Sequence, residues 1–170
     1  MIMKGVKEAE GGAEGLNALA ADRLREAFCV VSARELVASR LSGADGALEG
    51  AEALKAGSKV ARLLGFQLGR WEESRRLFEA VADGCEREHG ADAAETLTAR
   101  GNLAFAMQNT GAVVEARAVY EELLPRRIAA EGEGSEGVLV LQQNLATLLR
   151  NKLKDYAAAK PLHEAAVAGR

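Results

Sequence analysis

The sequence has 170 residues, of which 48% are hydrophobic and 28% are charged, and its formal net charge is −3. This balance is typical of a folded protein and argues against global disorder. The sequence has no strongly basic region that would attract a phosphate backbone, so we expect no nucleic-acid binding. It also has no apolar run near the ~20 residues that cross a bilayer, so we expect no membrane insertion.

The N-terminal part of the chain has the weakest pattern. Residues 1–15 are rich in Gly and Glu and lack the apolar segment of a secretory signal, which predicts a disordered tail. Residues 16–50 are predicted to form a helix and a loop, a degenerate half repeat whose helix covers the hairpin that follows. The two cysteines, Cys29 and Cys85, are too few for a disulfide framework and favour a reducing compartment, the cytoplasm.

From residue 51 onward the sequence repeats at an offset of 42 residues. Asn102 recurs with its neighbours as Asn144, 42 residues later, and Gly69 recurs in the same way as Gly111. A third copy follows with one extra residue inserted. A fixed offset is the mark of a stacked repeat array. We therefore predict about three repeats, at residues 51–92, 93–134 and 135–170.

Each repeat is predicted to hold two amphipathic helices separated by a short breaker such as Gly69 or Gly111. In the second helices, apolar or small residues recur three and four positions apart, so they share one helical stripe. The stripes hold Trp71, Ser74, Phe78, Val81 and Cys85; Val113, Ala116, Tyr120 and Leu123; Tyr156, Ala159, His163 and Ala166.

In the first helices, the same offset aligns Ala61, Leu64 and Leu68 with Leu103, Ala106 and Thr110. Alanines are expected where the two helices of a hairpin approach closely, because a larger side chain there would force the helix axes apart. These positions are Ala104, Ala116, Ala146 and Ala159.

The order of these residues resembles the tetratricopeptide repeat. Residues 69–74 (Gly-Arg-Trp-Glu-Glu-Ser) are similar to that family's Gly-Asp-Tyr-Glu-Glu-Ala turn. The period is longer than the usual ~34 residues, and with the string at residues 89–104 it resembles the kinesin light chain-like subtype. Ala93 and Ala94 stand where that subtype has His-Pro. The resemblance implies an all-α fold, a right-handed superhelical solenoid of stacked helix-turn-helix repeats, over residues 51–170.

The resemblance also implies a site on the first helix of each repeat, which in this family lines a concave groove. Asn102 and Asn144 lie one turn into these helices, where the family uses Asn to hold the backbone of a bound peptide. An amide suits this role because it both donates and accepts hydrogen bonds. Alternatively, each amide bonds to its own loop or to a neighbouring helix. The further groove candidates, for which ordinary solvated surface is the alternative, are Gln108, Asn109, Gln143, Arg150 and Asn151.

Some members of the family bind a C-terminal carboxylate through a clamp of Lys, Asn and Arg. In this sequence Val60 takes the place of the clamp's first Asn, and Asn144 takes the place of its later Arg. We therefore expect no such clamp.

Catalytic motifs are not evident. Cys85 and His89 lie four residues apart and could form half of a metal site, but Cys85 continues an apolar stripe, so core packing is preferred. The sequence has no Gly-rich phosphate loop, no Gly-x-Ser-x-Gly elbow and no His-Glu-x-x-His motif. We predict that the chain is not an enzyme and needs no cofactor.

The leading functional hypothesis is an interaction module or adaptor that binds a partner peptide in the concave groove. The alternative is a structural or self-associating repeat segment of a larger protein, with the end near residues 165–167 as the contact surface.

Overall fold

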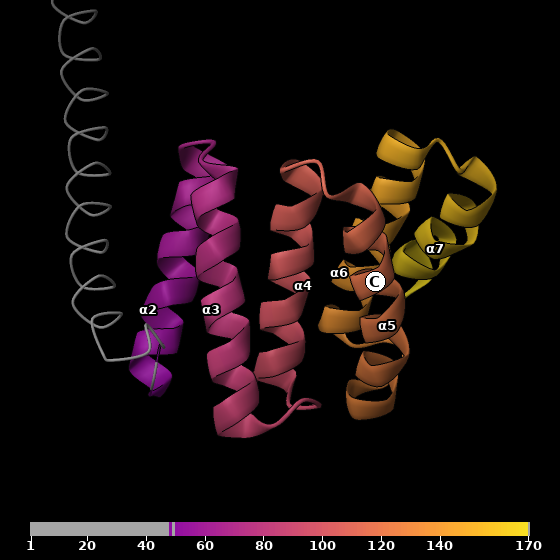
Figure 1. The fold of residues 1–170 in the computed structure, drawn as a ribbon. Coiled ribbons are helices and arrows are strands. Elements are labelled where there is room, and N and C mark those ends of the chain that lie inside the picture. The colour runs from indigo at the N-terminus through magenta and orange to yellow at the C-terminus, as the bar shows by residue number, and fades with distance from the viewer. Residues whose placement is uncertain (1–47, 49, 170) are drawn as a thin grey trace, which may run out of the picture.

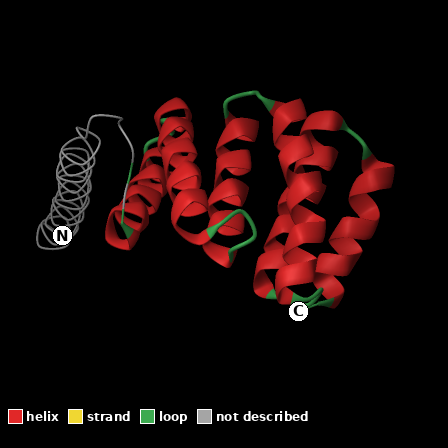
Figure 2. Cartoon of the chain, turned by 60° about the horizontal axis from the view of Figure 1, so that its bottom comes forward, coloured by secondary structure: helices red, strands yellow, loops and turns green. Residues whose placement is uncertain are grey.

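The computed structural model describes residue 48 and residues 50–169, and every regular element within them is a helix (Figures 1 and 2). The helices pair into three antiparallel hairpins that stand side by side in chain order (Figure 1). The predicted all-α solenoid is thereby confirmed. The predictions for residues 1–15, and most of those for 16–50, lie outside the described residues.

The first helices of the three hairpins are α2 (Ala51–Arg62), α4 (Ala94–Asn109) and α6 (Glu136–Leu148). The second helices are α3 (Trp71–His89), α5 (Val113–Glu131) and α7 (Tyr156–Ala168). One π-helical turn extends α2 (Leu63–Gln67) and another extends α6 (Leu149–Leu153).

Every helix contacts the next one along the chain, and α4 also contacts α6. The turns within the hairpins lie along the upper edge in Figure 1, and the connections between hairpins lie along the lower edge. None of the described helices combines the length and the apolar character that a membrane-spanning helix needs.

Two hydrophobic cores lie along the solenoid, and α4 contributes to both. The first core lies between α2, α3 and α4 and includes Phe78, which is 1% exposed. The second extends from α4 to α7 and includes Tyr120, which is fully buried. Ala99 and Ala106 of α4 belong to the first core, whereas Leu97 and other α4 residues belong to the second. Because both sides of α4 are covered, this helix fixes the position of one hairpin relative to the next.

Small residues occur where the two helices of a hairpin cross. The predicted close-approach alanines are all buried, none of them more than 2% exposed: Ala104, Ala116, Ala146 and Ala159. In the first hairpin, Ser74 takes the equivalent place on α3, and its hydroxyl donates a hydrogen bond of 2.7 Å to the carbonyl oxygen of Ala61 on α2. Burial of all four alanines is what the predicted close approach requires.

The first helix of the first hairpin is offset from that of the second by 43 residues rather than 42. Leu54 and Ala61 are buried (4% and 0% exposed), and so are Leu97 and Ala104, each 43 residues later (both 0%). The 42-residue alignment of α2 is therefore wrong by one residue. The π-helical turn at Leu63–Gln67 takes up the extra residue, because a π-helical turn holds one residue more than an α-helical turn.

This shift changes which residue of α2 corresponds to Asn102. The sequence alignment places Val60 there, but Val60 is 3% exposed and belongs to the first core. Lys59 occupies the position instead and is exposed. Leu68, predicted to lie on the apolar stripe, follows the π-helical turn and is 42% exposed.

The turns within the hairpins use a left-handed backbone conformation. Gly69 and Gly111 have φ angles of 65° and 93°, and Lys154 takes the same place in the third hairpin with φ of 59°. Glycine adopts this conformation without steric cost, whereas a residue with a Cβ atom does not.

The substitution Lys154→Gly should therefore stabilise the chain by about 0.5–1 kcal/mol, because removing the left-handed strain outweighs the larger chain entropy of glycine. Urea unfolding followed by circular dichroism measures this difference. Lys152→Gly, two residues earlier and within the π-helical turn, is the matched control and should destabilise the chain by about 1 kcal/mol. Equal losses in both variants would contradict the prediction.

Tyr120 carries a buried hydroxyl that has no hydrogen-bond partner among the described residues. Burial raises the pKa of this phenol, so the side chain stays neutral. Phe78, 42 residues earlier, fills the equivalent place in the first core without a hydroxyl.

Because an unpaired buried hydroxyl is costly, Tyr120→Phe should leave stability unchanged or raise it by about 1 kcal/mol. Tyr156→Phe serves as the control, since Tyr156 is 62% exposed and its substitution should have no effect. A clear loss of stability in Tyr120→Phe would mean that the hydroxyl has a partner in solution.

Candidate functional site

A hollow of about 280 Å³ lies between α4 and α6, the first helices of the second and third hairpins. Asn102 and Asn144 lie on its two sides, one from each helix. Within the described residues neither amide has a hydrogen-bond partner. The remaining lining residues are Thr98, Gly101, Arg127, Glu136, Gly137, Val140 and Leu141.

Arg127 reaches this hollow from α5 and joins three helices. Its Nε atom donates to Glu131 Oε1 at 3.0 Å, and its Nη2 atom donates to Thr98 Oγ1 of α4 at 2.8 Å. Glu131 also accepts from the hydroxyl of Ser135 at 3.0 Å. That hydroxyl in turn accepts from the backbone N–H of Val138 at 3.3 Å and caps α6. This network fixes the start of α6 against α4 and thereby sets the width of the hollow.

The sequence interpretation did not identify Arg127. The residue 42 positions earlier is Cys85, a member of the apolar stripe, and Arg127 itself is only 9% exposed. A cation at an apolar stripe position was the available signal, because a buried charge is costly unless it is paired.

Gly137, at the start of α6, leaves room for the guanidinium group. A Cβ atom at this position would lie 2.6 Å from Arg127 Cζ, which is closer than real contacts allow. The approach of α6 to Arg127 therefore depends on the absence of a side chain at this residue.

We expect Gly137→Ala to lower the free energy of unfolding by about 1–3 kcal/mol, because the methyl group would displace Arg127 from Thr98 and Glu131. Thermal or urea unfolding measures the loss. Gly134→Ala is the control, since a Cβ atom there meets nothing within 4 Å. If the two variants were equally stable, the contact between Arg127 and Gly137 would not constrain the fold.

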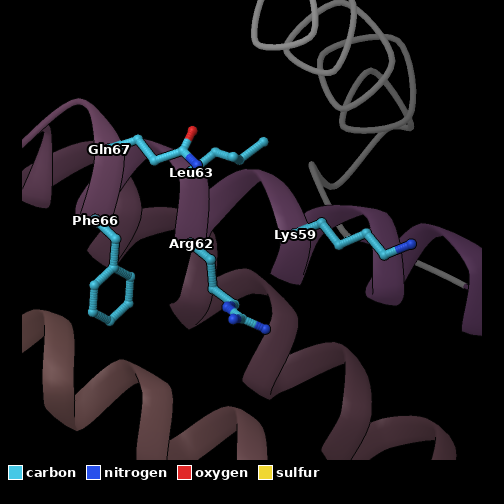
Figure 3. Close-up of a pocket in the computed structure, with 5 residues that line it drawn as sticks. All are labelled: Lys59, Arg62, Leu63, Phe66 and Gln67. Carbon is cyan, nitrogen blue, oxygen red and sulfur yellow. The ribbon is translucent and has the colours of Figure 1, made fainter. Parts of the chain in front are cut away.

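A second hollow, of about 360 Å³, lies along the first helix of the first hairpin. Arg62 and Phe66 project to one side of this helix (Figure 3). Lys59 and Arg62 have no ion pair within the part of the chain that the structure describes. The lining residues are Lys59, Arg62, Leu63, Phe66 and Gln67.

An aromatic cluster of Phe66, Trp71 and Phe105 adjoins the first hollow, which Phe66 lines. The ring of Phe66 stacks on that of Phe105 with 5.1 Å between centroids and meets Trp71 edge-on at 5.2 Å. Phe66 is nevertheless 60% exposed. Phe105 lies one helical turn after Asn102 on α4, so the cluster connects the two hollows along the first helices.

The other predicted groove residues are not brought into the hollows. Asn109 is exposed and donates to the carbonyl of Phe105 in its own helix at 2.7 Å. Arg150 donates to Asn151 at 3.1 Å in the exposed turn after α6. Gln143 is exposed beside Asn144 on α6. Gln108 is 7% exposed, and its buried Oε1 atom has no hydrogen-bond partner among the described residues.

Cys85 and His89 lie in different environments. Cys85 is 6% exposed, and burial, with the nearby Glu88 and Glu95, raises the pKa of its thiol. His89 is exposed at the end of α3. Among the residues that the structure describes, no group of three or more His, Cys, Asp or Glu side chains is placed to hold a metal ion.

Comparison with known proteins identifies the repeat. The family model of the tetratricopeptide repeat matches residues 56–92 and 96–136. These two segments are similar in sequence to the tetratricopeptide repeat. No curated protein sequence matches the chain significantly.

Solved structures share the fold of this chain. BtubC (BKLC) from P. vanneervenii aligns with a TM-score of 0.65 and 22% identity, over 81% of this chain and 53% of that one. The nearly identical TPR-like repeats of a Podosopora anserina protein assigned as a kinesin light chain align with a TM-score of 0.62 and 24% identity, over 68% and 54%. PlcR of Bacillus thuringiensis, in complex with the peptide PapR7 and DNA, aligns with a TM-score of 0.66 and 18% identity, over 85% and 49%.

At these identities the likeness is one of fold, and the chain spans about half the length of each of these structures. Tetratricopeptide repeats generally form extended surfaces for protein–protein interaction and have no catalytic role.

Proposed function

We propose that this chain is a non-catalytic adaptor module that binds an extended segment of a partner protein across α2, α4 and α6, in the cytoplasm. The observation that carries the proposal is the pair Asn102 and Asn144. Their amides face one hollow from two consecutive repeats, and neither is used by the described part of the fold.

An amide on each wall suits recognition of a peptide main chain. Each Asn side chain offers two N–H donors and one carbonyl acceptor, which match the carbonyl and N–H groups of an extended backbone. Such bonds carry no sequence preference, so discrimination among partners would come from the side chains that enter the two hollows. Exposed apolar groups in and near them, Val140 and Phe66, provide surface for apolar side chains.

The peptide complex of PlcR supports this proposal by showing that a fold of this kind occurs in a peptide-bound protein. The alternative of self-association through the last helix would rest on two exposed large side chains of α7, Tyr156 and Val167, which are 62% and 72% exposed. The groove proposal rests on two hollows and several unpaired polar groups, and we therefore prefer it.

We expect the double variant Asn102→Ala/Asn144→Ala to bind peptides about tenfold or more weakly than the wild type, because each lost hydrogen bond is worth about 0.5–1.5 kcal/mol. An array of immobilised mixed-sequence dodecapeptides, followed by titration of the captured peptides, measures the change.

The double variant Asn109→Ala/Asn151→Ala is the matched control. It removes two amides from the same two helical segments, but neither lines a hollow. Unchanged capture by the Asn102/Asn144 variant, or equal losses in both variants, would rule out the groove.

A further inference from the structure

The two hollows differ in the charges that line them. The first hollow carries Lys59 and Arg62, and no acidic residue lines it among the residues that the structure describes. The second carries Arg127 and Glu136, but Arg127 already forms an ion pair of 3.0 Å with Glu131. Glu136 has no ion pair among the described residues. The first hollow is therefore positive, and the second has a surplus of one negative charge.

Within the described part of the chain, nothing neutralises the positive charge of the first hollow. Lys59 and Arg62 are both exposed, and no carboxylate of the described chain compensates them. Phe66 presents an exposed ring on the same side of the helix as Arg62, whereas Lys59 extends from the other end of the hollow (Figure 3). This combination matches a segment in which an acidic side chain lies next to an apolar one, because the carboxylate meets the cations while the apolar group covers the ring.

The negative charge of the second hollow is likewise not neutralised by the described residues. Glu136 lies exposed in the first turn of α6. The network of Arg127 holds this turn in place. An acidic side chain of a bound segment would be repelled by the surplus negative charge of this hollow, whereas a lysine or arginine side chain would compensate that charge.

Building on the proposed function, we propose that the groove selects a partner segment of mixed charge. An acidic and an apolar side chain occupy the hollow on α2, and a basic side chain occupies the hollow between α4 and α6. The aromatic cluster adjoins the hollow on α2 and covers the neighbouring residues of the bound segment. The hollow between α4 and α6 lies about one and a half helix spacings from α2, which is about 15 Å because neighbouring helices lie roughly 10 Å apart. An extended chain advances about 3.3 Å per residue, so the acidic and basic residues would lie about four or five positions apart.

The test uses five pools of dodecapeptides whose remaining positions are random but uncharged. The mixed pools contain Leu-Glu and Lys five positions apart, in both orders along the peptide. The acidic pool has Glu in place of Lys, the basic pool has Lys in place of Glu, and the fifth pool contains neither residue. We expect the wild type to bind one of the mixed pools about threefold to tenfold more tightly than the other pools, as an estimate for two partly screened charge pairs.

Two sets of variants assign the effect to the hollows. Glu136→Gln should remove the preference for the mixed pool over the acidic pool. Lys59→Gln/Arg62→Gln should remove the preference for the mixed pool over the basic pool. The controls Glu133→Gln and Arg76→Gln change exposed charges outside both hollows and should keep the wild-type order. Unfolding curves confirm that each variant is folded.

The outcomes separate this inference from the function on which it rests. Equal binding of all pools, or tightest binding of the acidic or basic pool, would overturn the charge selection while leaving peptide binding intact. Binding of no pool by the wild type would overturn both. Loss of the preference in the control variants would assign it to the overall charge of the chain rather than to the hollows.

Discussion

The close approach of the two helices in each hairpin is the constraint on which the structure depends. Alanine or serine occupies the crossing points, and each of these side chains is buried. A bulky residue there would separate the helices, and the larger residues that fill the cores, such as Phe78 and Tyr120, would then no longer fit between neighbouring hairpins. The layer of first helices that carries the two hollows is a secondary result of this packing, because the second helices hold the first helices in register.

The repeat pattern made most of the fold predictable. Helical periodicity and the recurrence of Asn102 as Asn144 predicted paired helices, the crossing alanines, and two amides in equivalent places on consecutive repeats. These features depend on positions that recur, so a single sequence compared with itself contains them. The structure adds that the two amides share one hollow.

Features that belong to one repeat alone were not predictable in this way. The π-helical turn after Arg62 shifts α2 by one residue, and the sequence comparison consequently placed Val60 where Lys59 lies. Arg127 replaces a stripe residue in one repeat only, so no recurrence pointed to it. The contact between Phe66 and Phe105 joins residues 39 positions apart, which matches no repeat offset. Local geometry, rather than periodicity, decides all three.

The position of α4 between two cores has a consequence for how the chain unfolds. Its residues Ala99 and Leu97 are buried in different cores, so separating the first hairpin would expose apolar surface of the helix that also closes the second core. Opening either core without the other therefore carries a high free-energy penalty. The hairpins should lose their structure together, as one cooperative unit, even though each contacts only its neighbours.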